Sequence, residues 1–205
     1  YALQYCPPLP LIPGTFLYRG TILNDVNNDG YADVIRSEVK NQTYQYSYIN
    51  NLKDGGTGWS SDSNWVTPNA TYNDFSDGAQ LVDLNGDGLP EIFYRKSGTS
   101  KTYINNAKGW QEDVSSPWNN TFGYGDLTDG STQFGDINGD GLADMIIAKG
   151  GYSGGSRVLI NTGYGWVQDD SWVTEDGNFM NLGTRLLDAD SDGMLDFMMN
   201  HNYQA

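Results

Sequence analysis

Two residue types that carry much of enzyme chemistry are almost absent from this chain. Its 205 residues include one cysteine and one histidine. The lone Cys6 excludes an intramolecular disulfide, so it is either a buried thiol or half of a bridge to another chain. The lone His201 gives little support to a Ser-His-Asp triad, a Cys-His pair or a zinc hydrolase. No phosphate-binding glycine loop with lysine occurs, and we expect no enzyme and no catalytic residues.

Basic residues and long apolar runs are also scarce. Eleven Lys and Arg face twenty-six Asp and Glu, which gives a formal charge of −15. The basic residues do not cluster, so a nucleic-acid partner is excluded, because such a partner needs a cationic surface. No stretch approaches about 18 consecutive apolar residues, so we expect no membrane insertion. The chain begins at Tyr1 without an apolar signal segment, which favours a mature product or a fragment.

Acidic nine-residue loops, in contrast, occur four times. Each has Asp or Asn at positions one, three and five, Gly at six and Asp or Glu at nine. They read DVNNDGYAD (25–33), DLNGDGLPE (83–91), DINGDGLAD (136–144) and DADSDGMLD (188–196).

This pattern suits a hard divalent cation. Ca²⁺ takes six to eight oxygen ligands, and alternate residues of a tight loop can direct their oxygens to one centre. We expect position seven to supply its backbone carbonyl while its side chain packs inward, at Tyr31, Leu89, Leu142 and Met194. Simple acidic β-turns are the alternative for any single copy, and Mg²⁺ is disfavoured because it demands a strict octahedron. Four bound Ca²⁺ would bring the formal charge to about −7.

The loops belong to a longer repeat with starts 52 to 58 residues apart, a period typical of propeller blades. A short strand is predicted before each loop and another from its closing acid. A third strand carries Ile-Asn or a close variant, at Ile49, Ile104 and Ile160. A tryptophan pair follows, which we assign to packing between blades rather than to a ligand platform: Trp59 with Trp65, Trp110 with Trp118, and Trp166 with Trp172.

We therefore predict an all-β, propeller-like array of four-stranded blades, with calcium loops between strands one and two. A β-sandwich would not explain the period. The repeats span 14–205, with units starting near 15, 76, 129 and 181. The last unit lacks its third strand and tryptophans.

The apolar, proline-rich segment 1–13 is the candidate to complete that last unit. If it folds back, it closes a four-bladed ring within one chain. If it docks on the next chain, a filament results, because a head-to-tail contact that does not close gives a polymer. A third alternative is that the chain is a piece of a larger ring.

With these loops between strands, the chain resembles the FG-GAP/VCBS repeat family of integrin α heads, fungal calcium-containing lectins and bacterial toxin propellers. The resemblance covers roughly 14–200. It implies a propeller whose blades each carry a calcium loop, used in adhesion, glycan binding or assembly. By motif position it implies up to four calcium ions, with side-chain ligands Asp25, Asn27, Asp29 and Asp33; Asp83, Asn85, Asp87 and Glu91; Asp136, Asn138, Asp140 and Asp144; and Asp188, Asp190, Asp192 and Asp196.

The functional hypothesis is an extracellular calcium-binding module with a structural or adhesive role, in its stronger form a self-assembling filament subunit. A lectin is the alternative, because Tyr44, Tyr46 and Tyr48 alternate on one face of a strand. A propeller segment of a larger toxin or receptor is the third. Sequons at Asn41, Asn69 and Asn119 favour a secreted glycoprotein, whose partner would be its own copies, another extracellular protein or a glycan.

Overall fold

The computed structural model describes residues 20–39, 43–52, 58–120, 127, 132–147, 156–173, 185–191 and 194–198. The Pro-rich segment 1–13, Cys6, Asn41, Asp192 and His201 lie outside these residues. Predictions about them therefore stay predictions.

Three four-stranded antiparallel sheets follow one another along the chain, and each is one blade. The first strand of every blade pairs with the second, the second with the third and the third with the fourth, as in a meander. Blade 1 contains β1 (Thr21–Asn24), β2 (Asp33–Val39), β3 (Thr43–Asn50) and β4 (Trp59–Ser61). Blade 2 contains β5 (Ala79–Val82), β6 (Glu91–Lys96), β7 (Thr99–Asn105) and β8 (Trp110–Glu112). Blade 3 contains β9 (Thr132–Gly135), β10 (Asp144–Ile147), β11 (Arg157–Asn161) and β12 (Trp166–Gln168).

A two-stranded hairpin begins the fourth unit, and a single turn of 3-10 helix follows each complete blade. The hairpin pairs β13 (Arg185–Leu187) with β14 (Asp196–Met198). The helical turns are η2 (Ser63–Trp65), η3 (Pro117–Asn119) and η4 (Asp170–Trp172). None of the helices in the described part of the chain has the length and apolar character needed to cross a bilayer.

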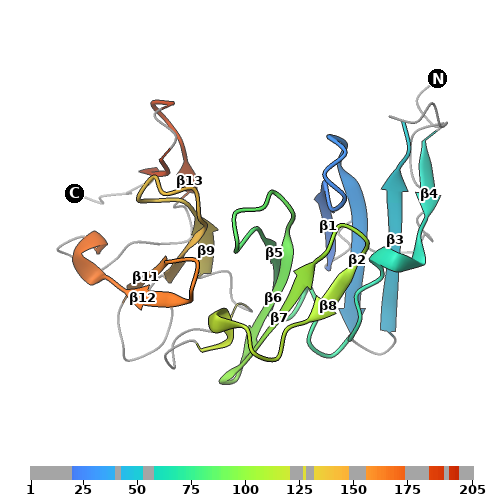
Figure 1. Cartoon of the computed structure of the whole chain (residues 1–205), viewed down its shortest axis with the longest axis horizontal. Coiled ribbons are helices and arrows are strands. Elements are labelled where there is room, and N and C mark those ends of the chain that lie inside the picture. Colours follow the sequence, from blue (N-terminus) through green and yellow to red (C-terminus); the bar gives the residue numbers. More distant parts are fainter. Residues whose placement is uncertain are drawn as a thin grey trace, which may run out of the picture.

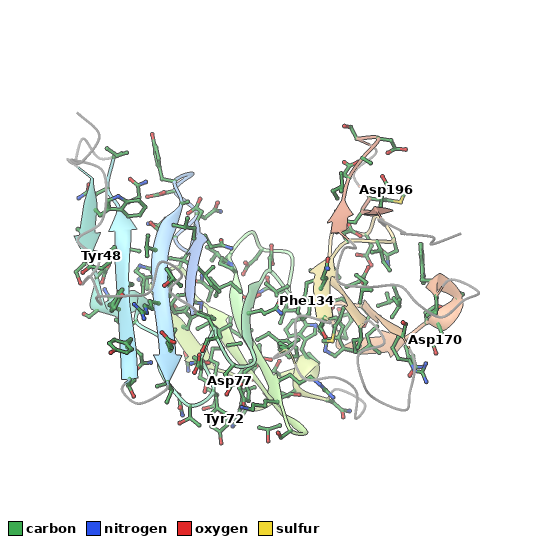
Figure 2. The ribbon with its side chains drawn as sticks, turned by 180° about the vertical axis from the view of Figure 1, so that it is seen from behind. Tyr48, Tyr72, Asp77, Phe134, Asp170 and Asp196 are labelled. Carbon is green, nitrogen blue, oxygen red and sulfur yellow. The ribbon has the colours of Figure 1, made fainter. Side chains whose placement is uncertain are left out.

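This architecture confirms the predicted all-β blade array. Every acidic loop connects the first and second strands of its unit, and Figure 1 shows these connections along one edge of the array. The isoleucines of the third strands occupy equivalent registers, since Ile49, Ile104 and Ile160 each pair with the middle residue of the fourth strand. Blade 1 and the β13–β14 hairpin lie at opposite ends, so the described sheets form an open array rather than a ring (Figures 1 and 2).

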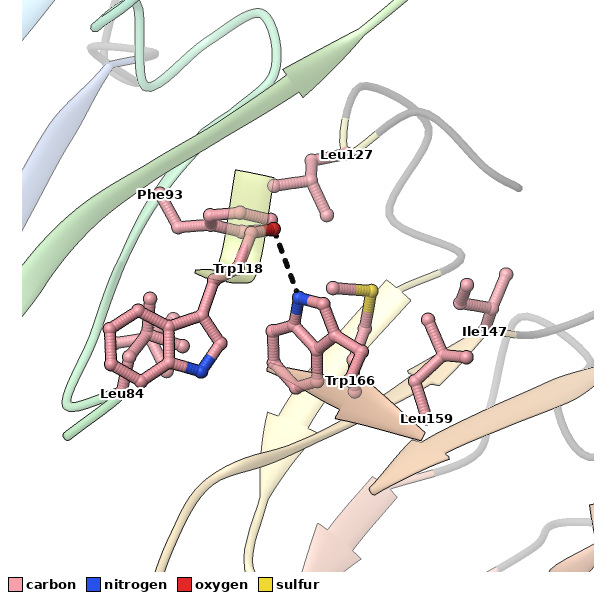
Figure 3. Close-up of a cluster of buried hydrophobic side chains, with 9 residues drawn as sticks. Leu84, Phe93, Trp118, Leu127, Ile147, Leu159 and Trp166 are labelled. Atoms are coloured by element: carbon pink, nitrogen blue, oxygen red, sulfur yellow. Dashed lines mark hydrogen bonds between the residues drawn. The ribbon is translucent and has the colours of Figure 1, made fainter. Parts of the chain in front are cut away.

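The core lies between blades. Leu84, Phe93 and Trp118 of blade 2 pack against blade 3 in one buried cluster (Figure 3). The residues of blade 3 in this cluster include Met145 and Trp166. The Trp166 indole nitrogen donates to the backbone carbonyl of Trp118 at 3.1 Å. Such faces bury apolar area only against a neighbour, which is why the chain needs consecutive repeats.

Tryptophans at the same sequence positions also join blades 1 and 2. Trp65 from blade 1 meets Trp110 from blade 2 edge to face, with ring centroids 5.3 Å apart. Both side chains are buried, as are Trp118 and Trp166 at the next interface. The prediction that the tryptophans pack between blades is confirmed for these four residues.

Candidate metal loops

The first loop folds around its own acidic side chains. Asp25 accepts two backbone N–H groups with its two carboxylate oxygens, from Asp29 at 3.0 Å and from Gly30 at 2.7 Å. The Asp29 N–H also lies 3.1 Å from the Asn27 amide oxygen, and Asp29 itself accepts the Tyr31 N–H at 2.9 Å. Positions one, three and five therefore turn their oxygens toward the inside of the loop.

Loops two and three repeat this arrangement. The carboxylates of Asp83 and Asp136 accept the N–H of Gly88 at 2.9 Å and of Gly141 at 2.8 Å. Each of these glycines sits at position six with a positive φ, of 84° and 86°, a region that favours glycine. Three loops of different sequence thus reach the same geometry.

Loop four gathers three carboxylates. One oxygen from each of Asp188, Asp190 and Asp196 lies within 4.8 Å of the others. Position three is Asp in this loop but Asn in the other three, where an amide oxygen takes the place of the carboxylate. This donor set of oxygens alone fits a hard cation such as Ca²⁺ rather than Zn²⁺, which prefers nitrogen and sulfur ligands.

The closing acids of the first three loops differ from the other acids, because they are buried inside the blades, whereas Asp196 of loop four is only partly buried. Asp33, Glu91 and Asp144 have no exposed surface. Burial raises the pKa of Asp33 to about 6 and that of Glu91 to about 7, against the lowering effect of backbone hydrogen bonds. The pKa of Asp144 is raised for the same reason. A cation beside these carboxylates would favour their ionised form.

The position-seven side chains do not all pack inward as predicted. Tyr31 is 39% exposed and Met194 is 38% exposed. Leu142 and Met194 instead lie over a glycine of the preceding loop. A Cβ added to Gly86 would come within 3.0 Å of Leu142, and one added to Gly139 within 3.3 Å of Met194. Neighbouring loops therefore touch each other. In the first three loops the inward position is position two, where Val26, Leu84 and Ile137 are buried.

Two of the predicted glycosylation sites lie in the described chain. Asn69 is exposed, and its amide oxygen accepts the Thr71 N–H at 3.0 Å. The Asn119 side chain is held at both ends, since its amide nitrogen donates to the Asp113 carbonyl and its oxygen accepts from the Thr102 hydroxyl. A glycan on Asn119 would disturb the first of these bonds.

Sequence reasoning missed the asparagine that ends each third strand. The backbone N–H groups of Asn50, Asn105 and Asn161 donate to the closing acid of their own blade. The Ile-Asn repeat contained the signal, but only the isoleucine was interpreted, as a register mark.

The sheets and loops together define a β-propeller-type protein built from loop-bearing blades. The model of the FG-GAP-like repeat matches residues 25–94 and 83–147, more than half of the chain. The chain belongs to this family of repeats, which confirms the predicted resemblance.

Two known proteins are similar over most of the chain. A T-cell immunomodulatory protein homolog from Plasmodium yoelii yoelii is 24% identical over 212 residues, which cover 88% of this chain and 30% of the relative. A solved lectin from Agrocybe aegerita, described in a study of specific recognition of non-reducing terminal N-acetylglucosamine, superposes with a TM-score of 0.58. It is 17% identical, and the match covers 86% of this chain and 45% of the lectin. The chain thus spans less than half of the length of each.

Proposed function

We propose that this chain is a non-enzymatic, calcium-binding blade module that acts outside the cell in adhesion or assembly. The observation that carries the proposal is the set of four oxygen-rich loops with the same sequence pattern, each between the first two strands of its unit along one edge of the array. Asp188, Asp190 and Asp196 of loop four bring three carboxylates together, which is costly unless a cation or protons offset their repulsion.

Calcium-binding modules with affinities of about 10⁻⁴ to 10⁻³ M fill only where calcium is millimolar, as it is outside cells. The exposed Asn69 sequon and the name of the T-cell immunomodulatory relative support the same location. Isothermal titration calorimetry of the intact chain tests calcium binding directly. Saturable uptake of up to four ions supports the proposal, and absence of heat with calcium in the millimolar range contradicts it.

In its stronger form the proposal is that copies of the chain associate through segment 1–13. It is supported by the open array, whose described ends do not meet. Light scattering over a concentration series, in calcium and then in chelator, tests this form. A calcium-dependent oligomer supports filament assembly, and a monomer at every concentration rules it out.

A second candidate function is glycan binding, favoured by a tyrosine face on blade 1. Tyr46 and Tyr48 meet edge to face with centroids 5.8 Å apart. The Arg36 guanidinium lies 4.8 Å from the Tyr44 ring centroid and donates to the Tyr46 hydroxyl. Aromatic faces beside fixed polar groups suit sugar rings, and the Agrocybe aegerita lectin shares the fold.

A glycan array in calcium that includes terminal N-acetylglucosamine tests this candidate. If the tyrosine face binds sugar, Tyr48→Ala abolishes the signal. Tyr164→Ala, at a 90% exposed residue of blade 3, leaves it unchanged. An array without any binder contradicts the candidate.

A further inference from the structure

A buried chain of hydrogen bonds runs through the three complete blades and connects their closing acids. Its members come from the second loop position, the closing acid and the third-strand asparagine. None is more than 2% exposed. They are Val26, Asp33, Asn105, Glu91, Leu84, Asn161, Asp144 and Ile137.

The first link joins loop one to loop two. The Val26 N–H donates to the closing acid of its own loop, Asp33, at 3.1 Å. The Val26 carbonyl accepts the side-chain amide of Asn105, from blade 2, at 2.8 Å. The backbone N–H of the same Asn105 donates to Glu91, the closing acid of loop two, at 3.3 Å.

The second link repeats the first between loops two and three. Glu91 accepts the Leu84 N–H at 2.9 Å, and the Leu84 carbonyl accepts the Asn161 side-chain amide at 2.8 Å. The Asn161 backbone N–H donates to Asp144 at 2.8 Å, and Asp144 also accepts the Ile137 N–H at 3.1 Å.

Asn50 occupies the same position in blade 1 but has no preceding loop among the described residues. Its side-chain amide donates to the Ala32 carbonyl of its own blade, at 3.4 Å. Its backbone N–H still donates to Asp33, at 2.8 Å. The bond from an asparagine side chain to the preceding loop is thus specific to the two blade interfaces.

This connection gives each position-two residue at a blade interface two hydrogen-bonding roles. Its N–H group holds the closing acid of its own loop, and its carbonyl holds the asparagine that positions the next closing acid. The two groups belong to the successive peptide planes on either side of the residue's Cα, so fixing one closing acid restrains the neighbouring plane, whose carbonyl orients the next. Buried hydrogen bonds are strong and polarise one another. A change in the orientation of one closing acid is therefore passed along the chain of bonds to the next closing acid.

We infer that cation binding to adjacent loops is positively cooperative, with Asn105 coupling loops one and two and Asn161 coupling loops two and three. The inference rests on the proposed calcium function. A loop preorganised by its filled neighbour no longer spends binding free energy on ordering itself, and it binds more tightly. Both asparagines are positioning residues that act through the closing acids.

Site-resolved calcium titration of the isotope-labelled intact chain by NMR tests the inference. The amide signals of Gly30, Gly88 and Gly141 report loops one, two and three separately, because each N–H donates to the first acid of its own loop. Asp87→Ala removes an exposed side chain of loop two and leaves the buried hydrogen-bond chain in place. We expect it to weaken calcium binding at loop one by about fivefold or more, the lower end of typical coupling.

Asn105→Ala completes a double-mutant cycle. In its background, Asp87→Ala should no longer change the affinity of loop one. Asn50→Ala is the matched control, in which the dependence of loop one on loop two persists. If Asn105→Ala does not fold, the fall-off of the effect with distance along the array is measured instead. Asp140→Ala in loop three should weaken calcium binding at loop two more than at loop one.

Failure of the coupling and failure of calcium binding itself give different results. Calcium titration of loop one that is identical with and without Asp87→Ala overturns the coupling while leaving calcium binding intact. An Asp87→Ala effect that survives fully in Asn105→Ala assigns the coupling elsewhere and overturns the role of Asn105. If none of the three glycine signals responds to calcium, the proposed function itself fails.

Discussion

In the first three loops the acids are of two kinds, and the sequence pattern alone does not separate them. Positions one and five are carboxylates at the loop surface that accept N–H groups of their own turn, as Asp136 does for Gly141. Position nine is enclosed between strands and bonded to two backbone N–H groups, as Asp144 is to Ile137 and Asn161. Sequence identified all of these as oxygen donors. Whether the closing acid is buried depends on the neighbouring strand that pairs beside it, and that pairing is seen only in the fold.

This difference predicts losses of stability of unequal size for two substitutions in loop three. Asp144→Ala leaves two buried N–H groups unpaired, each worth about 1–3 kcal/mol, so we expect the free energy of unfolding without metal to fall by about 2–6 kcal/mol. Asp140→Ala exposes its former N–H partner to water and should cost less than about 1 kcal/mol. Urea denaturation in chelator measures both. Equal losses would contradict the assignment of a structural role to the closing acid.

In the presence of calcium, Asp140→Ala should cost more stability than it does in chelator. Because its side chain lies in the oxygen-lined part of the loop, we expect the variant to lose one bound ion and the corresponding stabilisation of blade 3. Calorimetric stoichiometry and thermal melting, each with and without calcium, check this. A full complement of ions in Asp140→Ala would remove Asp140 from the predicted ligand set.

At the scale of strands and blades, sequence periodicity was a reliable guide where the signal was local. Each first strand ends at the residue directly before its acidic loop, as predicted, because the loop residues form a turn. For contacts between blades, the sequence predicts that tryptophans pack there but not which residues meet. That Trp65 meets Trp110, and that Leu142 lies over Gly86, depends on how consecutive sheets are placed. The error at Met194 has this origin, because its loop has a neighbouring loop beside it as well as a core beneath it.

The blade interfaces predict unequal roles for the two tryptophans of the third pair. Trp166 is buried between blades 2 and 3, whereas Trp172 is 39% exposed. Trp166→Ala should lower the free energy of unfolding by about 3–5 kcal/mol through the cavity it leaves. Trp172→Ala should lower it by less than half as much. Chemical denaturation followed by the remaining tryptophan fluorescence measures both, and similar losses would contradict packing of Trp166 as the dominant contact.

Close approach of the blades also depends on one glycine before a tryptophan. Gly109 has φ of +138°, and a Cβ there would lie 2.4 Å from the Asn64 carbonyl oxygen of blade 1. Gly98 also has a positive φ, of 77°, but has open space around it. Gly98→Ala should cost about 1 kcal/mol for its backbone conformation alone. Gly109→Ala should cost about 1–3 kcal/mol more, because backbone must shift. Paired thermal melts decide the point, and equal melting temperatures would argue against a tight blade contact.

For the whole molecule, charge and fold are linked through the loops. Thirteen of the twenty-six acids lie in four nine-residue stretches, against only eleven basic residues in the chain. The blades align these stretches along one edge, so their charges repel within loops and between neighbours that touch. Self-repulsion of this kind destabilises a folded state.

Calcium should therefore raise the melting temperature of the intact chain well above its value in chelator. An ion that binds only the folded state adds about 2.7 kcal/mol at a hundredfold excess over its dissociation constant, and several sites add together. Sodium chloride at matched ionic strength is the control, because screening alone would reproduce part of the effect. Magnesium should stabilise less, since it keeps its waters and demands a strict octahedron. Calorimetric scans in calcium, magnesium, sodium and chelator distinguish these cases, and equal melting in all four would mean that the loops hold their shape by hydrogen bonds alone.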